Sequence, residues 1–190
     1  MLDKDVRHAV KNKVLKDHIN DPSTLVIEEL GLNYGRNRVD LAVINGEIHG
    51  YELKSDSDTL IRLPNQAECY SLVMDKVTLV VGVKHSKEAI ALVPDWWGVK
   101  IAVMGSKGGV SLVTKRHNKK NKNVNPFELL KLIWKDEVIE LLSSKIAIDW
   151  RIKKLKKEEI HQLVVDNFSL DEIRENTRII LKSRVGWRFD

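Results

Sequence analysis

Several features that commonly reveal a protein's class are scarce or absent in this chain. It has a single cysteine, Cys69, which excludes a disulfide within the chain and favours a reducing compartment. No apolar run approaches the roughly 18 residues of a membrane-spanning helix, and no signal peptide is recognisable at the N-terminus. We therefore expect a cytoplasmic protein with no membrane association.

Two common kinds of binding site are missing as well. The sequence has no cluster of cysteine and histidine residues that would hold zinc. It also has no glycine-rich loop followed by Lys-Ser or Lys-Thr, the pattern that cradles nucleotide phosphates in P-loop proteins. The glycine-rich segment 105–109 is better explained as a turn between two strands.

The chain does have an apolar fraction and a charge balance that inform the fold and the partner. Its 190 residues are 43% hydrophobic, which predicts one packed domain with an appendage. The formal net charge is +5 and the isoelectric point is about 9.2, which fits a polyanionic partner.

Residues 38–54 form the most informative segment. An apolar strand pattern carries Asp40, a turn follows at Asn45-Gly46, and a second strand pattern ends in Glu52-x-Lys54. Two carboxylates can hold a divalent metal ion, and a lysine facing the same pocket can steady a water molecule or a phosphate. The segment predicts a magnesium-dependent phosphodiesterase site, with Mn²⁺ as the substitute for Mg²⁺.

This prediction depends on which side chains share a face of the sheet. Alternation along a strand places Glu52 and Lys54 on one face. On the preceding strand it groups Asp40 with Ala42 and Ile44, and it places Val39, Leu41 and Val43 on the opposite face.

The prediction also depends on the length of the hairpin loop. A two-residue loop at Asn45-Gly46 would pair Asp40 with Tyr51, so that Asp40 and Glu52 would lie on opposite faces. A site therefore requires one extra residue, which either a bulge at His49-Gly50 or a loop lengthened through Glu47 would supply.

A third acid has two candidates. Residues 24–30 read as another strand, and a return centred on Tyr34-Gly35 would place Glu29 directly opposite Asp40. Like charges directly opposite one another destabilise a sheet, so this pair indicates a cation between them. The alternative is Asp5, although an acid in the first turn of a helix is also explained by the helix dipole.

Two more polar residues follow on an expected helix. Asn65 is expected to cap a helix over residues 66–74, where Gln66 and Tyr70 would share a face because they are four residues apart. Beside a metal site such a pair can orient a lysine, a water molecule or a nucleotide. A surface glutamine and a half-buried tyrosine are the simpler explanation.

Together, these residues resemble the PD-(D/E)XK nuclease superfamily. The last pair is similar to that of RecB-type nucleases, although Val39 stands where the motif's literal proline would precede the acid. Other segments resemble a family of small bacterial PD-(D/E)XK proteins over most of the chain, among them Glu-Glu-Leu-Gly at 28–31, Arg-Leu-Pro-Asn-Gln at 62–66 and Val-Pro-Asp-Trp-Trp-Gly at 93–98. The resemblance implies a nuclease that hydrolyses DNA, with Asp40, Glu52 and Glu29 as metal ligands and Lys54, Gln66 and Tyr70 beside them in the catalytic site.

The order of expected elements supports an α/β fold. We expect a restriction-endonuclease-like core over residues 1–114, in which a mixed sheet is flanked by helices. A basic linker is expected at 115–123, followed by a helical C-terminal subdomain at 124–190. The expected elements outside the segments already named are helices over 4–18, 86–91, 126–142 and 150–168, strands over 76–83, 99–104 and 110–113, and a last helix capped by Ser169.

The turn at 167–169 joins two of these helices, so it fits either a DNA-reading helix-turn-helix or a helical lid packed on the sheet. The lid is the commoner arrangement.

Binding to DNA is expected to be mainly electrostatic. The candidate contacts are Arg36, Arg38, Arg62, Lys115, Arg116, Lys119 and Lys120. The alternative to a nuclease is a catalytically silent DNA-binding module on the same fold. A homodimer or a subunit of a larger nucleic-acid-processing complex is also compatible with the sequence.

Overall fold

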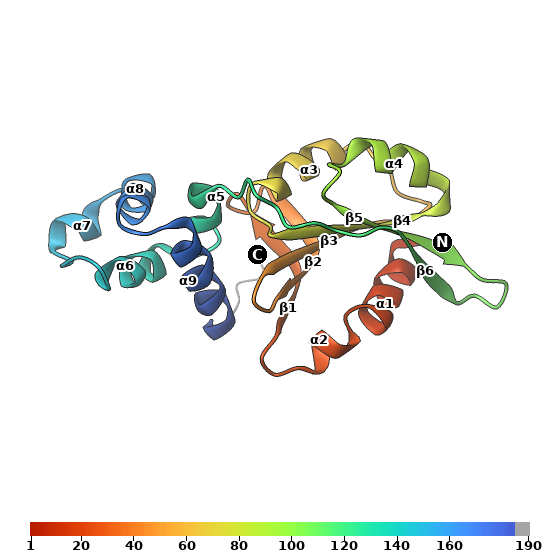
Figure 1. Cartoon of the computed structure of the whole chain (residues 1–190), viewed down its shortest axis with the longest axis horizontal. Coiled ribbons are helices and arrows are strands. Elements are labelled where there is room, and N and C mark those ends of the chain that lie inside the picture. Colours follow the sequence, from red (N-terminus) through yellow and green to blue (C-terminus); the bar gives the residue numbers. More distant parts are fainter. Residues whose placement is uncertain (185–190) are drawn as a thin grey trace.

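The computed structural model of the chain describes residues 1–184. A six-stranded mixed sheet forms its centre, with the strands side by side in chain order (Figure 1). Neighbouring strands are antiparallel except for the two parallel pairs β3–β4 and β4–β5. The strands are β1 (Leu25–Leu32), β2 (Asn37–Ile44), β3 (Ile48–Lys54), β4 (Lys76–Gly82), β5 (Gly98–Met104) and β6 (Val110–Arg116).

Helices cover both faces of the sheet. On one face lie α3 (Leu63–Ser71) and α4 (Ser86–Leu92), the latter preceded by the short 3-10 helix η1 (Val83–His85). The other face is covered by α1 (Asp3–Lys13), which is followed by α2 (Lys16–Asn20). Each face has its own apolar core, with the larger one on the side of α3. The predicted α/β fold with a mixed sheet, flanking helices and C-terminal helices is confirmed.

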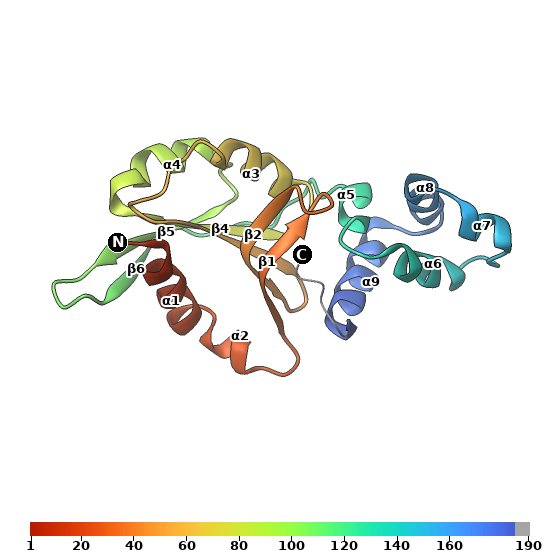
Figure 2. The ribbon, with the colours of Figure 1, turned by 180° about the vertical axis from the view of Figure 1, so that it is seen from behind.

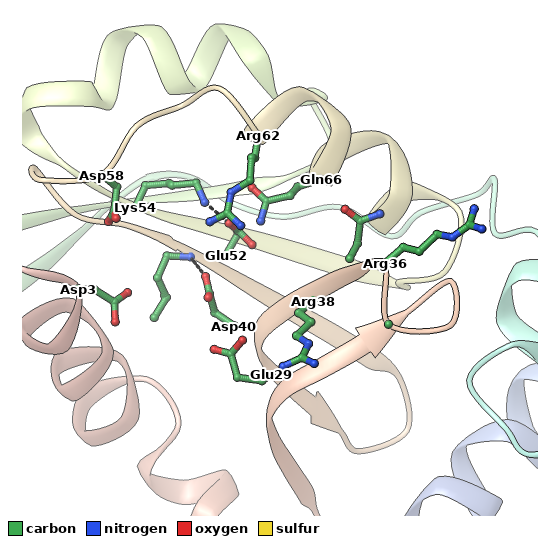
Figure 3. A pocket seen from close by; sticks show the side chains of 13 residues that line it. Asp3, Glu29, Arg36, Arg38, Asp40, Glu52, Lys54, Asp58, Arg62 and Gln66 are labelled. Carbon is green, nitrogen blue, oxygen red and sulfur yellow. Dashed lines mark hydrogen bonds and ion pairs between the residues drawn. The ribbon is translucent and has the colours of Figure 1, made fainter. Parts of the chain in front are cut away.

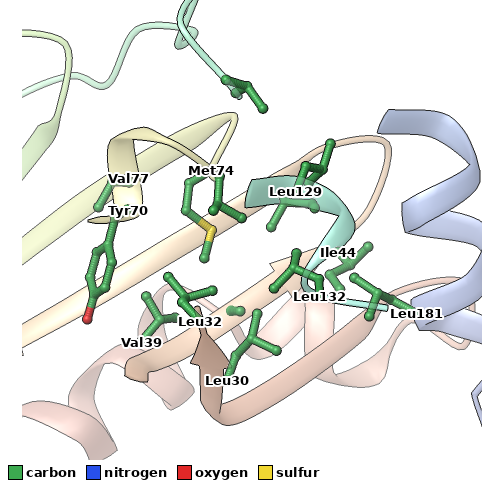
Figure 4. Close-up of a cluster of buried hydrophobic side chains, with 14 of the residues drawn as sticks. Leu30, Leu32, Val39, Ile44, Tyr70, Met74, Val77, Leu129, Leu132 and Leu181 are labelled. Atoms are coloured by element: carbon green, nitrogen blue, oxygen red, sulfur yellow. The ribbon is translucent and has the colours of Figure 1, made fainter. Parts of the chain in front are cut away.

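Within residues 1–184, five C-terminal helices extend from one end of the sheet (Figure 2). They share the larger apolar core with the strands, because Leu129, Leu132 and Leu181 lie in the same buried cluster as Leu30 and Ile44 (Figure 4). The helices are α5 (Pro126–Leu130), α6 (Lys135–Ser143), α7 (Trp150–Lys154), α8 (Lys157–Asn167) and α9 (Leu170–Ser183).

A buried ion-pair cluster fixes α9 against the start of β4. Asp75 accepts a hydrogen bond from the backbone N–H of Ile48 at 2.8 Å, and its carboxylate lies 3.3 Å from Arg174 Nε and 3.8 Å from Arg178 Nη1. The two basic side chains of α9 are therefore directed into the protein. This packing matches the expected helical lid better than a helix presented to DNA.

The segment expected to be a linker is ordered in a different way from the prediction. Lys115 and Arg116 are the last residues of β6, and Arg116 donates to the backbone carbonyls of Trp97 and Pro94. Further on, the buried side chain of Asn121 donates to the carbonyls of Ser71 and Met74 at the end of α3. Residues 117–125 thus form a strap held by hydrogen bonds. The division into core, linker and helical subdomain stays a prediction.

Several expected helix boundaries were wrong. The opening helix ends at Lys13 and a separate short helix follows, and helix α3 begins at Leu63 rather than at Gln66. Pro64 explains the second difference, because proline is favoured in the first turn, where its missing N–H costs nothing. Ser169 caps α9 as predicted, by accepting from the backbone N–H of Glu172.

Within residues 1–184, no helix combines the length and apolar character that crossing a membrane requires.

Candidate functional site

The β2–β3 hairpin has the one-residue extension that a site requires. Ile44 pairs with Ile48 and Leu41 pairs with Tyr51, so the loop consists of residues 45–47. The N–H of Asn45 bonds to the carbonyl of Glu47 at 3.1 Å across this loop. The prediction of an extra residue is confirmed, by the longer loop rather than by a bulge. Continuing the same register places Asp40 opposite Glu52.

The β1–β2 register also follows the prediction, with an interruption at one position. Pairing runs from Leu25–Ile44 to Glu28–Leu41 and resumes at Leu30–Val39. Between these pairs, Glu29 has a left-handed backbone with φ of +54°, and Asp40 is the residue that would face it. The ladder is therefore irregular at the position where the two acids meet.

This irregularity changes the faces assigned to β2. Val39 lies in the larger core cluster together with Ala42 and Ile44, whereas Leu41 lies in the smaller cluster on the side of α1. The strict alternation expected for Val39 was therefore wrong, because the strand turns at Asp40. The N–H of Leu53 on β3 donates to the carboxylate of Asp40 at 2.7 Å, instead of to a backbone carbonyl of β2.

A guanidinium from α1 supplies the cation between the two acids. Arg7 Nη2 lies 3.2 Å from Glu29 Oε1 and 3.3 Å from Asp40 Oδ1, and Nη1 donates to the backbone carbonyl of Asp40 at 3.2 Å. Arg7 Nε also reaches Asp3 at 3.3 Å. The sequence indicated a cation but not this residue. A basic residue on the sheet-facing side of the opening helix was the available signal.

A second charge pair lies deeper in the same region. The carboxylate of Glu52 is fully buried, with Lys54 Nζ donating to its Oε1 atom. The hydroxyl of Tyr70 lies 2.7 Å from Glu52 Oε2 and 2.5 Å from the carbonyl of Arg38, so its one proton serves one acceptor at a time. Gln66 Nε2 donates to the same hydroxyl at 3.3 Å. Helix α3 thus brings Gln66 and Tyr70 to the acids, as the sequence predicted.

The electrostatics of the region follow from burial. Burial and the neighbouring charge of Glu52 raise the pKa of Asp40 to about 7, against the lowering effects of the Leu53 N–H, Lys54 and Arg7. Burial and Glu52 also raise the pKa of Tyr70 far above its usual value. Around neutral pH, Tyr70 therefore stays a neutral donor and Asp40 is only partly ionised.

These residues border an open polar pocket of about 360 Å³ (Figure 3). Its base carries Asp40, Glu52 and Lys54, and its outer part carries three arginines, Arg36, Arg38 and Arg62. Asp3 and Asp58 also line the pocket, although no pattern in the sequence had pointed to them. Asp58 is engaged locally, because it accepts from the N–H and hydroxyl of Ser55.

Some predicted residues lie elsewhere. Asp5 is not among the residues that line the pocket, and its carboxylate accepts from the backbone N–H of Leu2 at the start of α1. Lys115 and Arg116 lie in β6, across the sheet from the pocket, and Lys119 and Lys120 belong to the strap that follows it. The seven expected DNA contacts are thus split between two regions, with Arg36, Arg38 and Arg62 at the pocket.

The carboxylates of the pocket do not fit a Mg²⁺ site as they are placed. Both oxygens of Asp40 have protein partners, in Arg7 and the Leu53 N–H, and both oxygens of Glu52 do too, in Lys54 and Tyr70. Among residues 1–184, no group of three or more His, Cys, Asp or Glu side chains is arranged to hold a metal ion. Binding of Mg²⁺ or Mn²⁺ stays a prediction.

Comparison with known families decides between the remaining interpretations. Residues 2–188 match the family model described as Bacteriophage P4 protein cII. The chain belongs to this family. It is similar to "Protein cII" of Enterobacteria phage P4, with 26% identity over 188 residues that cover 97% of this chain and 68% of the relative. No solved structure matches the chain.

Membership of the protein cII family corrects the functional expectation. The match spans nearly the whole chain, so the assignment to the PD-(D/E)XK superfamily was wrong, and the nuclease and hydrolase descriptions that followed from it were wrong too. Neither the match nor the described residues support the description as a metal-binding protein. The physical reason is that an acid followed by Glu-x-Lys is a short pattern. Here Asp40 pairs with Arg7 and Glu52 pairs with Lys54.

Proposed function

We propose that this member of the protein cII family binds DNA, with the pocket arginines contacting the phosphate backbone. The observation that carries the proposal is the position of Arg36, Arg38 and Arg62 around one pocket. They come from the β1–β2 turn, from β2 and from the residue before α3. Arginine suits this role because its planar fork of donors matches phosphate oxygens.

Two of the pocket arginines are not paired with the acids below them. Asp40 and Glu29 share the guanidinium of Arg7, and Glu52 is paired with Lys54. By contrast, Arg36 and Arg62 are exposed and make no ion pair or hydrogen bond through their side chains within residues 1–184. The unpaired charge at the outer part of the pocket is therefore basic, while Asp3 and Glu29, each about half exposed, line the pocket beside Arg7.

A buried acceptor indicates that more than a bare phosphate is bound. Gln66 is only 8% exposed, and its Oε1 atom has no hydrogen-bond partner among the described residues although the side chain lines the pocket. A buried polar atom without a partner costs free energy, and such atoms are uncommon. A nucleotide offers both the phosphate for the arginines and an N–H or O–H donor for Gln66.

The test is a salt titration of DNA binding by fluorescence anisotropy, with labelled duplex and single-stranded oligonucleotides. The double variant Arg36→Gln/Arg62→Gln is compared with Lys87→Gln/Lys107→Gln, which removes the same charge from exposed residues that do not line the pocket. For each phosphate that the protein no longer neutralises, the slope of log affinity against log salt becomes shallower by about 0.9 on duplex DNA. The pocket variant should bind DNA more weakly and with a shallower slope. The control should keep most of the parent's affinity and most of its slope. Absence of DNA binding, or equal effects in the two variants, would contradict the proposal.

Three further expectations accompany this proposal. A cytoplasmic location is supported by the single cysteine and by the basic, nucleic-acid-directed charge. A homodimer or a larger nucleic-acid-processing complex stays a prediction, which sedimentation with and without DNA would test. Calorimetric titration with Mg²⁺ would test the metal prediction separately.

A further inference from the structure

Two exposed aromatic rings with basic neighbours lie outside the pocket, one in the turn that carries Arg36 and the other on α7. The ring of Tyr34 is in the β1–β2 turn, two residues before Arg36, and Tyr34 is 51% exposed. The ring of Trp150 is on α7, and Trp150 is 63% exposed. We infer that these two rings and their basic neighbours bind single-stranded DNA, with bases stacking on Tyr34 and Trp150. The inference rests on the proposed function and names the form of DNA bound.

The backbone around Tyr34 points to a function for its ring. Asn33, Tyr34 and Gly35 all have left-handed backbones, with φ of +47°, +58° and +82°. Glycine and asparagine adopt this conformation readily, but for a bulky residue it is strained. Burial does not offset that strain, because half of Tyr34 is exposed to solvent. Strain at an exposed aromatic residue is typical of a binding site.

Lysines from the C-terminal helices surround the ring of Tyr34. Lys157 Nζ, at the start of α8, lies 5.0 Å from the ring centroid, and Lys131 Nζ, directly after α5, lies 5.6 Å from it. Lys131 also donates to Asn33 Oδ1 at 3.3 Å. These contacts bring Lys131 and Lys157 to the β1–β2 turn, next to the pocket residue Arg36.

The same arrangement is repeated at Trp150. Lys154 Nζ lies 4.8 Å from the centroid of the Trp150 ring, and the guanidinium of Arg151 lies 5.7 Å from it. Lys154 and Lys157 are three residues apart, so one short basic segment supplies a cation to each ring. Residues 150–157 contain five basic residues and no acid, namely Arg151, Lys153, Lys154, Lys156 and Lys157.

The acids near the two rings do not make the local charge negative. Asp149 caps α7, Glu159 caps α8 by accepting from the N–H of Lys156, and Glu128 is paired with Lys131. Glu158 is the remaining acid close to Tyr34.

Rings with neighbouring cations fit single strands better than duplexes. In a duplex the base faces are stacked on one another, whereas the bases of a single strand can stack on exposed aromatic side chains. The flexible lysines that now lie over the rings can move to the phosphates when a base takes that position. A strand that follows Trp150 and Tyr34 would then reach Arg36 and the pocket.

The test compares Tyr34→Asn and Trp150→Ala with the parent protein in anisotropy titrations of a labelled oligothymidine. Asparagine tolerates the left-handed backbone, so Tyr34→Asn removes the ring without adding strain. The affinity of each variant for the single strand should fall by about 5- to 150-fold, which corresponds to about 1–3 kcal/mol per stacked base. Tyr34→Phe should keep the parent affinity. Ile179→Ala, which truncates another exposed apolar residue, is the control for nonspecific effects.

Duplex binding by the same variants separates this inference from the proposed function. Duplex affinity should change little in Tyr34→Asn and Trp150→Ala but fall in Arg36→Gln/Arg62→Gln. If the aromatic variants bind the single strand as the parent does, this inference is wrong while the arginine site stands. If neither DNA form binds to the parent, both proposals are wrong. Circular dichroism and thermal melting check that each variant is folded.

Discussion

Arg7 and Asp40 are joined at two points, since the guanidinium contacts the Asp40 carboxylate at 3.3 Å and donates to the Asp40 backbone carbonyl at 3.2 Å. The first helix is thereby fixed to the place where β2 leaves its regular pairing. The same guanidinium neutralises Glu29 on β1. One side chain thus links α1 to two strands and makes the close approach of the acids tolerable.

The first prediction concerns this guanidinium. Arg7→Ala should lower the free energy of unfolding by about 1–3 kcal/mol, because it leaves partly buried acids without their charged donor. Arg7→Lys should recover only part of this, since one ammonium cannot reproduce the planar fork. The measurement is urea denaturation followed by circular dichroism. Lys4→Ala, at an exposed position of the same helix, should stay within about 0.5 kcal/mol of the parent. Similar destabilisation in both variants would contradict the role of Arg7.

The second prediction concerns pH. The pKa of Asp40 is about 7 in the folded protein, whereas its ordinary value is 3.8, so between these values the folded state holds more protons than the unfolded state. Its contribution to stability is therefore full below about pH 4 and disappears as the pH rises through 7. Each pKa unit corresponds to about 1.4 kcal/mol. The contribution of Asp40 to the free energy of unfolding therefore has an upper bound on the order of 4 kcal/mol.

Asp40→Asn removes this titration. Melting temperatures of the parent and the variant, measured across pH 4–8, should show a shallower decline in the variant. Parallel curves would show that Asp40 titrates near its ordinary pKa. Comparing slopes removes any effect of the substitution that does not depend on pH, such as altered packing.

The third prediction concerns the buried carboxylate of Glu52. Tyr70→Phe keeps the ring and its packing but removes the hydroxyl next to Glu52 Oε2, so the variant should be less stable by about 1–3 kcal/mol. Tyr51→Phe is the matched control, because the hydroxyl of Tyr51 contacts the neutral ring of His49, at 3.3 Å, rather than a carboxylate. In thermal unfolding, Tyr51→Phe should have a higher melting temperature than Tyr70→Phe. The reverse order would contradict the assignment.

The fourth prediction concerns the attachment of α9. Asp75→Ala leaves Arg174, which is 11% exposed, as a charge without its buried acid, and should cost about 3–5 kcal/mol. Asp171→Ala removes the same kind of partner from the same arginine at a 90% exposed position and should cost much less. Limited proteolysis should cut α9 earlier in the Asp75 variant. Equal protection in the two variants would show that the apolar core alone holds α9.

Strand pairing at the site could be predicted because it depends on local rules. The return at Tyr34-Gly35 follows from the residues that turns favour and fixes that Glu29 faces Asp40. Side-chain alternation showed that the two-residue loop favoured by Asn45-Gly46 would separate Asp40 from Glu52, and the loop through Glu47 was one of the two extensions that a site would require. The position of Tyr70 followed in the same way from helical spacing.

The parts that could not be predicted depend on contacts between distant segments. Arg7 reaches the acids only because α1 packs on the sheet, and Asp75 binds residues of α9 that are far along the chain. The change of face at Val39 accompanies the interrupted pairing at Glu29 and Asp40, which local alternation does not contain. The function was misjudged because residue types alone do not distinguish paired charges from a catalytic site.

The order of the strands has a consequence for synthesis on the ribosome. Since the sheet runs from β1 to β6 in chain order, each new strand can add to the edge left by its predecessor, and none has to be inserted between two that are already in place. Contacts with residues made later must wait, among them that of Lys13 with the carbonyl of Val110 and that of Asp75 with Arg174. The nascent protein therefore completes its sheet first and receives its last helix as the closing step.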